Sequence, residues 1–97
     1  LIQKFPEAHD AAAAQYYVGE SYYYKKMCQR AIPEYQKVIT NHRSSDQVPD
    51  ALLMLGHCSA DLNRRADAMG FYQRVLKEYP QSTAAMLATQ RLDRLGQ

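Results

Sequence analysis

The chain has 97 residues and a formal net charge of +2, with 46% hydrophobic and 23% charged residues. This length allows one domain with a modest core. Both signs of charge are mixed along the sequence, so we expect no dedicated nucleic-acid surface. No apolar run approaches the ~18 residues of a membrane span, so we expect no direct membrane insertion.

The pattern predicts helices from end to end. Residues 1–5 match the ends of the later repeats and indicate the remnant of a preceding helix, so we expect a fragment of a longer protein. Pro49 suits the first turn of a helix, Ser82 suits an N-cap, and Gly96 suits a left-handed helix end. Pro33 avoids the loss of a helical hydrogen bond only if its helix begins near residue 29 or 30. Five helices follow the remnant, at about 7–24, 29–41, 49–62, 66–78 and 82–95.

A spacing of 37 residues is the strongest feature of the sequence. A fixed period between about 20 and 50 residues is typical of stacked repeat proteins. Positions that keep the spacing are Ala14, Ala51 and Ala88; Val18, Leu55 and Leu92; Gly19 and Gly56; Ala31 and Ala68; and Tyr35 and Tyr72. We predict an all-α solenoid of antiparallel helix pairs. It divides into the end of a preceding repeat (1–6), two repeats (7–43 and 44–80) and a capping helix (81–97).

The repeated glycines predict where the helices approach each other. A glycine inside a helix costs roughly 1 kcal/mol relative to alanine, so close packing must compensate. We expect Gly19 to lie near Ala31 and Gly56 near Ala68. The bulkier residues around them are assigned to the core: Val18, Tyr22, Tyr35, Leu55 and Tyr72.

These positions resemble the tetratricopeptide repeat (TPR). The matching residues are Gly19, Tyr22, Ala31, Tyr35 and Val38 in the first repeat, and Gly56, Ala68, Tyr72, Val75 and Pro80 in the second. The usual repeat has 34 residues, and the extra length here falls in the loop around 44–48. The resemblance implies a scaffold for protein–protein interaction and not an enzyme.

Longer stretches are similar to one group of such proteins, the C-terminal domain of the periplasmic, Tol–Pal-associated YbgF or CpoB family. They are QYYVGESYYY (15–24), AIPEYQKVI (31–39), VPDALLMLG (48–56) and YPQSTAAMLATQRLDRL (79–95). The resemblance implies a periplasmic protein of the cell envelope that works with the Tol–Pal system at cell division, with a TolA-like periplasmic domain as its partner. The alternative is a structural TPR component of an outer-membrane assembly complex. An enzyme would need a catalytic domain elsewhere in the chain.

The sequence offers no pattern of catalytic, cofactor or metal chemistry. The three histidines have no metal spacing, and no phosphate-binding glycine motif occurs. We read His57 as a groove residue because no nucleophile is forced beside it. Cys28 and Cys58 are interpreted as two thiols on which the fold does not depend, although a disulfide between them is open in an oxidising compartment.

A stripe of tyrosines indicates the binding surface. Tyr16, Glu20, Tyr23 and Tyr24 share one side of the first helix, at helical spacing. The same side recurs 37 residues later with Leu53, His57 and Asp61. Such a stripe is either core or a concave surface, and we favour a surface that binds a protein segment, because tyrosine is enriched in binding hot spots. Glu20 and Asp61 then select basic groups. The exposed repeat ends also suggest self-association.

Overall fold

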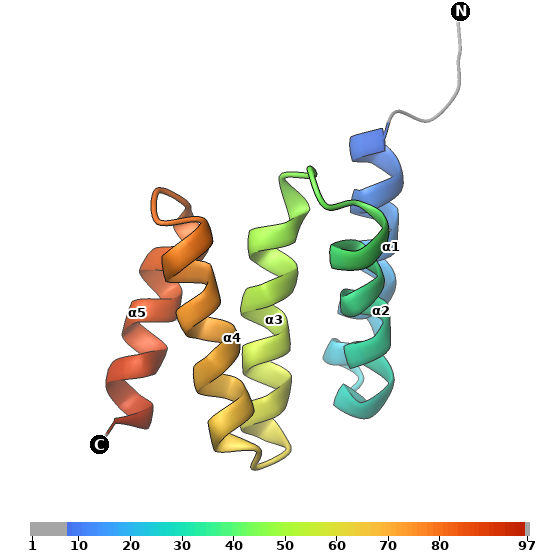
Figure 1. Ribbon diagram of the computed structural model, residues 1–97. Helices are drawn as coiled ribbons and strands as arrows, with labels where there is room; N and C mark the ends of the chain where they lie inside the picture. The colour runs from blue at the N-terminus through green and yellow to red at the C-terminus, as the bar shows by residue number, and fades with distance from the viewer. Residues whose placement is uncertain (1–7, 97) are drawn as a thin grey trace, which may run out of the picture.

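The computed structural model describes residues 8–96, and every regular element within them is a helix. Figure 1 shows the helices stacked side by side in chain order. They are α1 (Ala8–Tyr24), α2 (Cys28–Asn41), α3 (Gln47–Asp61), α4 (Arg65–Glu78) and α5 (Thr83–Leu95). The five predicted helices are confirmed, each within two residues of its expected bounds. The predicted remnant at 1–5 lies outside the described residues. No helix within residues 8–96 has both the length and the apolar character to cross a membrane.

The helices form a curved row. Each one packs against its neighbours in the chain, and in addition α1 contacts α3 and α3 contacts α5. Within the part of the chain that the structure describes, the backbones of α2 and α4 lie farther apart than those of α1 and α3 or of α3 and α5. The row therefore curves toward the odd-numbered helices. We call the side formed by α1, α3 and α5 the inner face, and the side formed by α2 and α4 the outer face.

A tyrosine ring fills the space above each repeated glycine. A Cβ atom on Gly19 would lie 2.6 Å from Cε1 of Tyr35, and one on Gly56 would lie 2.7 Å from Cδ1 of Tyr72. Both rings are fully buried and belong to one continuous core. The predicted close approach at the two glycines is confirmed, but the nearest group on the facing helix is the tyrosine and not the alanine. Ala31 is also fully buried, one turn before Tyr35.

The turns between paired helices also repeat at 37 residues. Lys26 and Asn63 have φ angles of 63° and 64°, in the left-handed region. The amide N–H of Met27 donates to the carbonyl of Tyr22 at 2.9 Å, and that of Arg64 donates to the carbonyl of Ser59 at 2.7 Å. This is the hydrogen bond of a Schellman motif, which ends a helix on a left-handed residue.

Three local predictions differ from the structure, and one is confirmed. Gly96 has a φ of −72°, so the predicted left-handed end of α5 is wrong. Pro33 lies beyond the first turn because α2 begins at Cys28, so its ring removes one helical hydrogen bond. Val18, assigned to the core, is 43% exposed because no described helix packs on that side of α1. Ser82 caps α5 as predicted, accepting from the amide of Ala85 at 3.0 Å.

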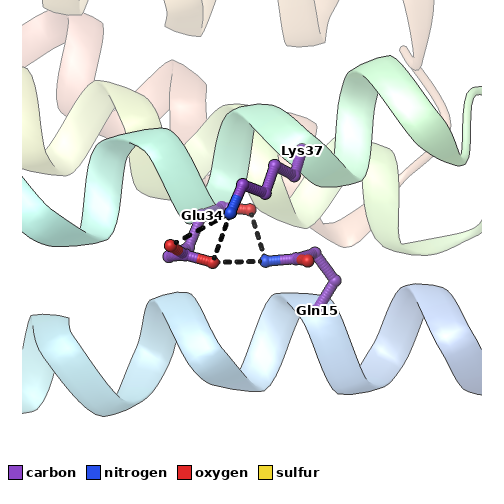
Figure 2. Close-up of polar contacts among 3 residues, drawn as sticks. All are labelled: Gln15, Glu34 and Lys37. Carbon is purple, nitrogen blue, oxygen red and sulfur yellow. Dashed lines mark hydrogen bonds and ion pairs between the residues drawn. The ribbon is translucent and has the colours of Figure 1, made fainter.

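A polar contact holds α1 against α2 beside the first glycine crossing (Figure 2). The Gln15 amide donates to the Glu34 carboxylate at 2.8 Å and to the Glu34 carbonyl at 3.2 Å. Lys37 lies 3.4 Å from the same carboxylate. In the second repeat the positions of Gln15 and Glu34 are taken by Leu52 and Phe71, which pack in and against the core. One repeat therefore uses hydrogen bonds where the other uses apolar contact.

The glycine crossing gives a prediction about stability. We expect Gly56→Ala to lower the free energy of unfolding by about 1–3 kcal/mol, because its Cβ would collide with the buried Tyr72 ring. Gly70 is the matched control, since it lies inside α4 and a Cβ atom added there would meet no neighbouring atom within 4 Å. Gly70→Ala should raise the free energy of unfolding by up to about 1 kcal/mol, because alanine has the higher helix propensity. Urea denaturation measures both, and equal effects would contradict the packing role of Gly56.

The left-handed turn gives a second prediction. A left-handed conformation costs lysine about 1–2 kcal/mol, whereas asparagine tolerates it. Asparagine stands at the equivalent position of the second repeat, Asn63. Lys26→Asn should therefore raise the free energy of unfolding by about 0.5–1 kcal/mol. Lys25→Asn is the control, because Lys25 is also exposed and has no positive φ. Thermal melting followed by circular dichroism distinguishes the two variants, and a gain for both would mean that charge and not backbone conformation is responsible.

Candidate protein-binding site

The structure places most of the predicted stripe on the inner face. Tyr24 is 75% exposed, and Asp61 is also exposed. Four residues are half-buried: Tyr16, Glu20, Tyr23 and His57. Leu53 is 6% exposed and belongs to the core, so we remove it from the surface. Binding of a partner by the remaining residues stays a prediction.

In the first repeat the stripe is anchored to the buried crossing. The hydroxyl of Tyr35 donates to the Glu20 carboxylate at 2.5 Å. The ring of Tyr16 lies against that of Tyr35, with centroids 5.6 Å apart. Burial, followed by the nearby carboxylate of Glu20, raises the pKa of Tyr16 above its usual range. Tyr16 and Glu20 are therefore held in place by contacts beneath the surface.

The second repeat has the same geometry with different chemistry. His57 stands 37 residues after Glu20, and its Nδ1 shares a hydrogen bond of 2.6 Å with the hydroxyl of Tyr72. Burial and, second, the charge of Arg91 lower the pKa of His57 to about 4. Burial raises the pKa of Tyr72 to about 12. At neutral pH this pair is uncharged, whereas the equivalent pair in the first repeat contains the carboxylate of Glu20.

Two residues of the inner face were missed from the sequence, Asp50 and Arg91. Burial, and then the negative charge of Glu20, raises the pKa of Asp50, which places this α3 carboxylate beside α1. Arg91 of α5 influences His57 and Tyr23, so it lies toward the same face. Asp50 had a detectable signal, because it stands seven residues before His57 on the same helical stripe.

The charges are divided along the inner face. The carboxylates of Glu20, Asp50 and Asp61 lie on α1 and α3, and Arg91 lies on α5. Among the side chains of residues 11–96, the ion pairs are Lys37–Glu34 and Arg74–Glu78, both within even-numbered helices. The three inner carboxylates thus form a negative region with no ion pair in the described part of the chain.

Surface hollows lie on both faces. One of about 480 Å³ adjoins the tyrosine stripe and is lined by Tyr23, Tyr24, Lys26, Cys28, Asp61 and Leu62. Another of about 450 Å³ lies on the outer face between α2 and α4, with Ser59 and Gly70 among its lining residues. Two of its lining residues are small: Ser59 stands where position 22 of the first repeat has a tyrosine, and Gly70 has no side chain. Residues 8–96 contain no cluster of His, Cys, Asp or Glu suited to a metal ion.

The buried His57 gives a prediction about pH. Its pKa is about 4 in the folded protein and about 6.5 in an unfolded chain, so the unfolded state takes up the proton first. The contribution of neutral His57 to the free energy of unfolding is therefore fully present above about pH 6.5, and it is lost as the pH falls toward about 4. We expect wild type to lose about 1–2 kcal/mol more than His57→Gln between about pH 7 and pH 5. Urea unfolding at both pH values checks this, and parallel losses would assign the pH dependence to other groups.

Comparison with known proteins agrees with this geometry. No curated protein matches the chain. The family model described as tetratricopeptide repeat matches residues 13–45 and 50–82. The two matched segments begin 37 residues apart, and each contains one glycine–tyrosine crossing. Such repeats generally mediate protein–protein interactions and are typically non-catalytic scaffolds. The chain belongs to the tetratricopeptide repeat family.

Proposed function

We propose that the inner face binds a segment of another protein that carries basic side chains. The surface consists of Tyr16, Glu20, Tyr23, Tyr24, Asp50, His57, Asp61 and Arg91. The observation that carries the proposal is the pair Tyr23 and Tyr24, whose rings meet edge to face with centroids 5.4 Å apart. Tyr24 is largely exposed although it is a large aromatic residue, and it adjoins the hollow that Asp61 also lines.

The arrangement suits a bound segment in two ways. The edge-to-face contact holds the tyrosines before binding, so less side-chain freedom is lost when a partner arrives. An exposed tyrosine face accepts an apolar group or the cation of lysine or arginine. The carboxylates of Asp61 and Asp50 favour a positively charged partner and disfavour an acidic one.

The partner we propose is a TolA-like periplasmic domain, and the compartment we propose is the periplasm. In this role the protein coordinates the Tol–Pal system during cell division. The support is the similarity of the stretches around residues 15–24 and 48–56 to the YbgF or CpoB family. Those stretches supply five of the proposed surface residues: Tyr16, Glu20, Tyr23, Tyr24 and Asp50.

Calorimetric titration with a TolA-like domain tests the surface. Tyr24→Ala should weaken binding by about 2 kcal/mol, close to thirtyfold, with little change in melting temperature because the side chain is exposed. Asp61→Asn should weaken binding mainly at low salt. Asp67→Asn is the matched control, since Asp67 is an exposed acid on the outer hollow.

The outcomes separate the partner from the surface. If wild type does not bind a TolA-like domain, that partner is rejected. If wild type binds and Tyr24→Ala binds equally well, the inner face is rejected, and an effect of Asp67→Asn would then point to the outer hollow.

A further inference from the structure

Two cysteines from different repeats meet beneath the rim of the inner face. Cys28 is the first residue of α2, and Cys58 lies in the last turn of α3. The thiol of Cys28 donates a hydrogen bond to Oδ2 of Asp61 at 3.9 Å, and Asp61 stands one helical turn after Cys58 on α3. The pKa of each cysteine responds to the other, so the two side chains lie close together. Both cysteines are free and buried in the same core.

The two thiols differ in access. Cys58 is completely buried, whereas Cys28 is 7% exposed and lines the hollow of about 480 Å³ beside the tyrosine stripe. A small reagent that enters this hollow meets the sulfur of Cys28 first. Cys58 lies behind it, in the position of a second thiol that can displace whatever Cys28 has bound.

We propose that Cys28 and Cys58 are a reversible dithiol–disulfide pair that joins the two repeats, with a small-molecule disulfide as the oxidant. Cys28 is the attacking thiol and Cys58 is the resolving thiol. This role is independent of the partner proposed for the inner face.

The reaction proceeds in two exchanges that balance atoms and electrons. The thiolate of Cys28 attacks one sulfur of the reagent, an S–S bond forms to that sulfur, and the reagent's other half leaves as a thiolate. The thiolate of Cys58 then attacks the sulfur of Cys28, and the remaining half of the reagent leaves. The two protein sulfurs lose two electrons in total, the reagent gains two, and both protein protons pass to the released thiolates.

The surroundings of both thiols set the rate. Burial raises the pKa of Cys28, the Cys58 thiol opposes that rise, and the charge of Asp61 adds to it. Burial also raises the pKa of Cys58. Exchange should therefore be slow at neutral pH and accelerate up to about tenfold per pH unit, since the thiolate is the nucleophile. The charged and titratable groups facing Cys28 are Asp61 and Cys58 on α3, Tyr23 on α1, and Lys26 in the turn that follows α1.

The test is intact-mass spectrometry of the folded protein after incubation with 2-hydroxyethyl disulfide. Wild type should lose two hydrogen atoms, and digestion should yield a Cys28–Cys58 cross-linked peptide. Cys58→Ser should stop at the mixed disulfide on Cys28, and Cys28→Ser should remain unmodified on the same timescale. Accumulation of the mixed disulfide in wild type, or cross-linking only between molecules, would overturn the proposal even if neither variant folds.

A rate measurement separates this chemistry from simple exposure. Asp61→Asn removes a negative charge beside Cys28, so it should speed the first exchange several-fold at about pH 8. Asp67→Asn, on the outer face, should leave the rate unchanged. The oxidised protein should also melt at least about 5 °C higher than the reduced protein, because the bond closes a loop between two repeats. An unchanged rate in Asp61→Asn, or a lower melting temperature after oxidation, would argue against the assignment.

Discussion

The fold depends on a side chain that is absent. At Gly19 and Gly56 the helix surface has no Cβ, and the ring of a tyrosine from the paired helix occupies that space. The ring is too large to be placed there without the glycine, and the glycine would weaken its helix without the ring. Each crossing also sets the polar surface above it, because the buried hydroxyl must reach a partner on the odd-numbered helix. Glu20 and His57 supply that partner. Packing in the core thereby orients two residues of the candidate binding face.

The two repeats share a backbone arrangement but differ in the polar side chains at equivalent positions. At equivalent positions one tyrosine bonds a carboxylate and the other an imidazole. The polar contact between Gln15 and Glu34 becomes an apolar contact in the next repeat. These differences are compatible with one backbone because the glycine and the buried tyrosine at each crossing stay the same. The inner face is consequently asymmetric, with tyrosines on α1, acids on α1 and α3, and a cation on α5.

Most of the architecture follows from the sequence, because the same pattern of residues recurs at a 37-residue period in equivalent helices. The helices and the glycine crossings were predictable for that reason. Side-chain exposure was harder, since it depends on neighbours. Val18 has the same register as the buried Leu55 but has no described helix above it, and Leu53 shares the stripe of His57 yet turns into the core. Arg91 joined the surface through the curvature of the stack, which no local pattern encodes. The end of α5 shows that glycine permits a left-handed residue without requiring one.

The separation of α2 from α4 has a geometric consequence. Repeat arrays of this kind are nearly one-dimensional stacks in which each unit contacts its neighbours. Here the helices of the inner row lie closer together than those of the outer row. The array is therefore shaped like an arch. A segment laid along the inner face would contact adjacent odd-numbered helices directly, whereas one laid along the outer face would meet α2 and α4 across a hollow.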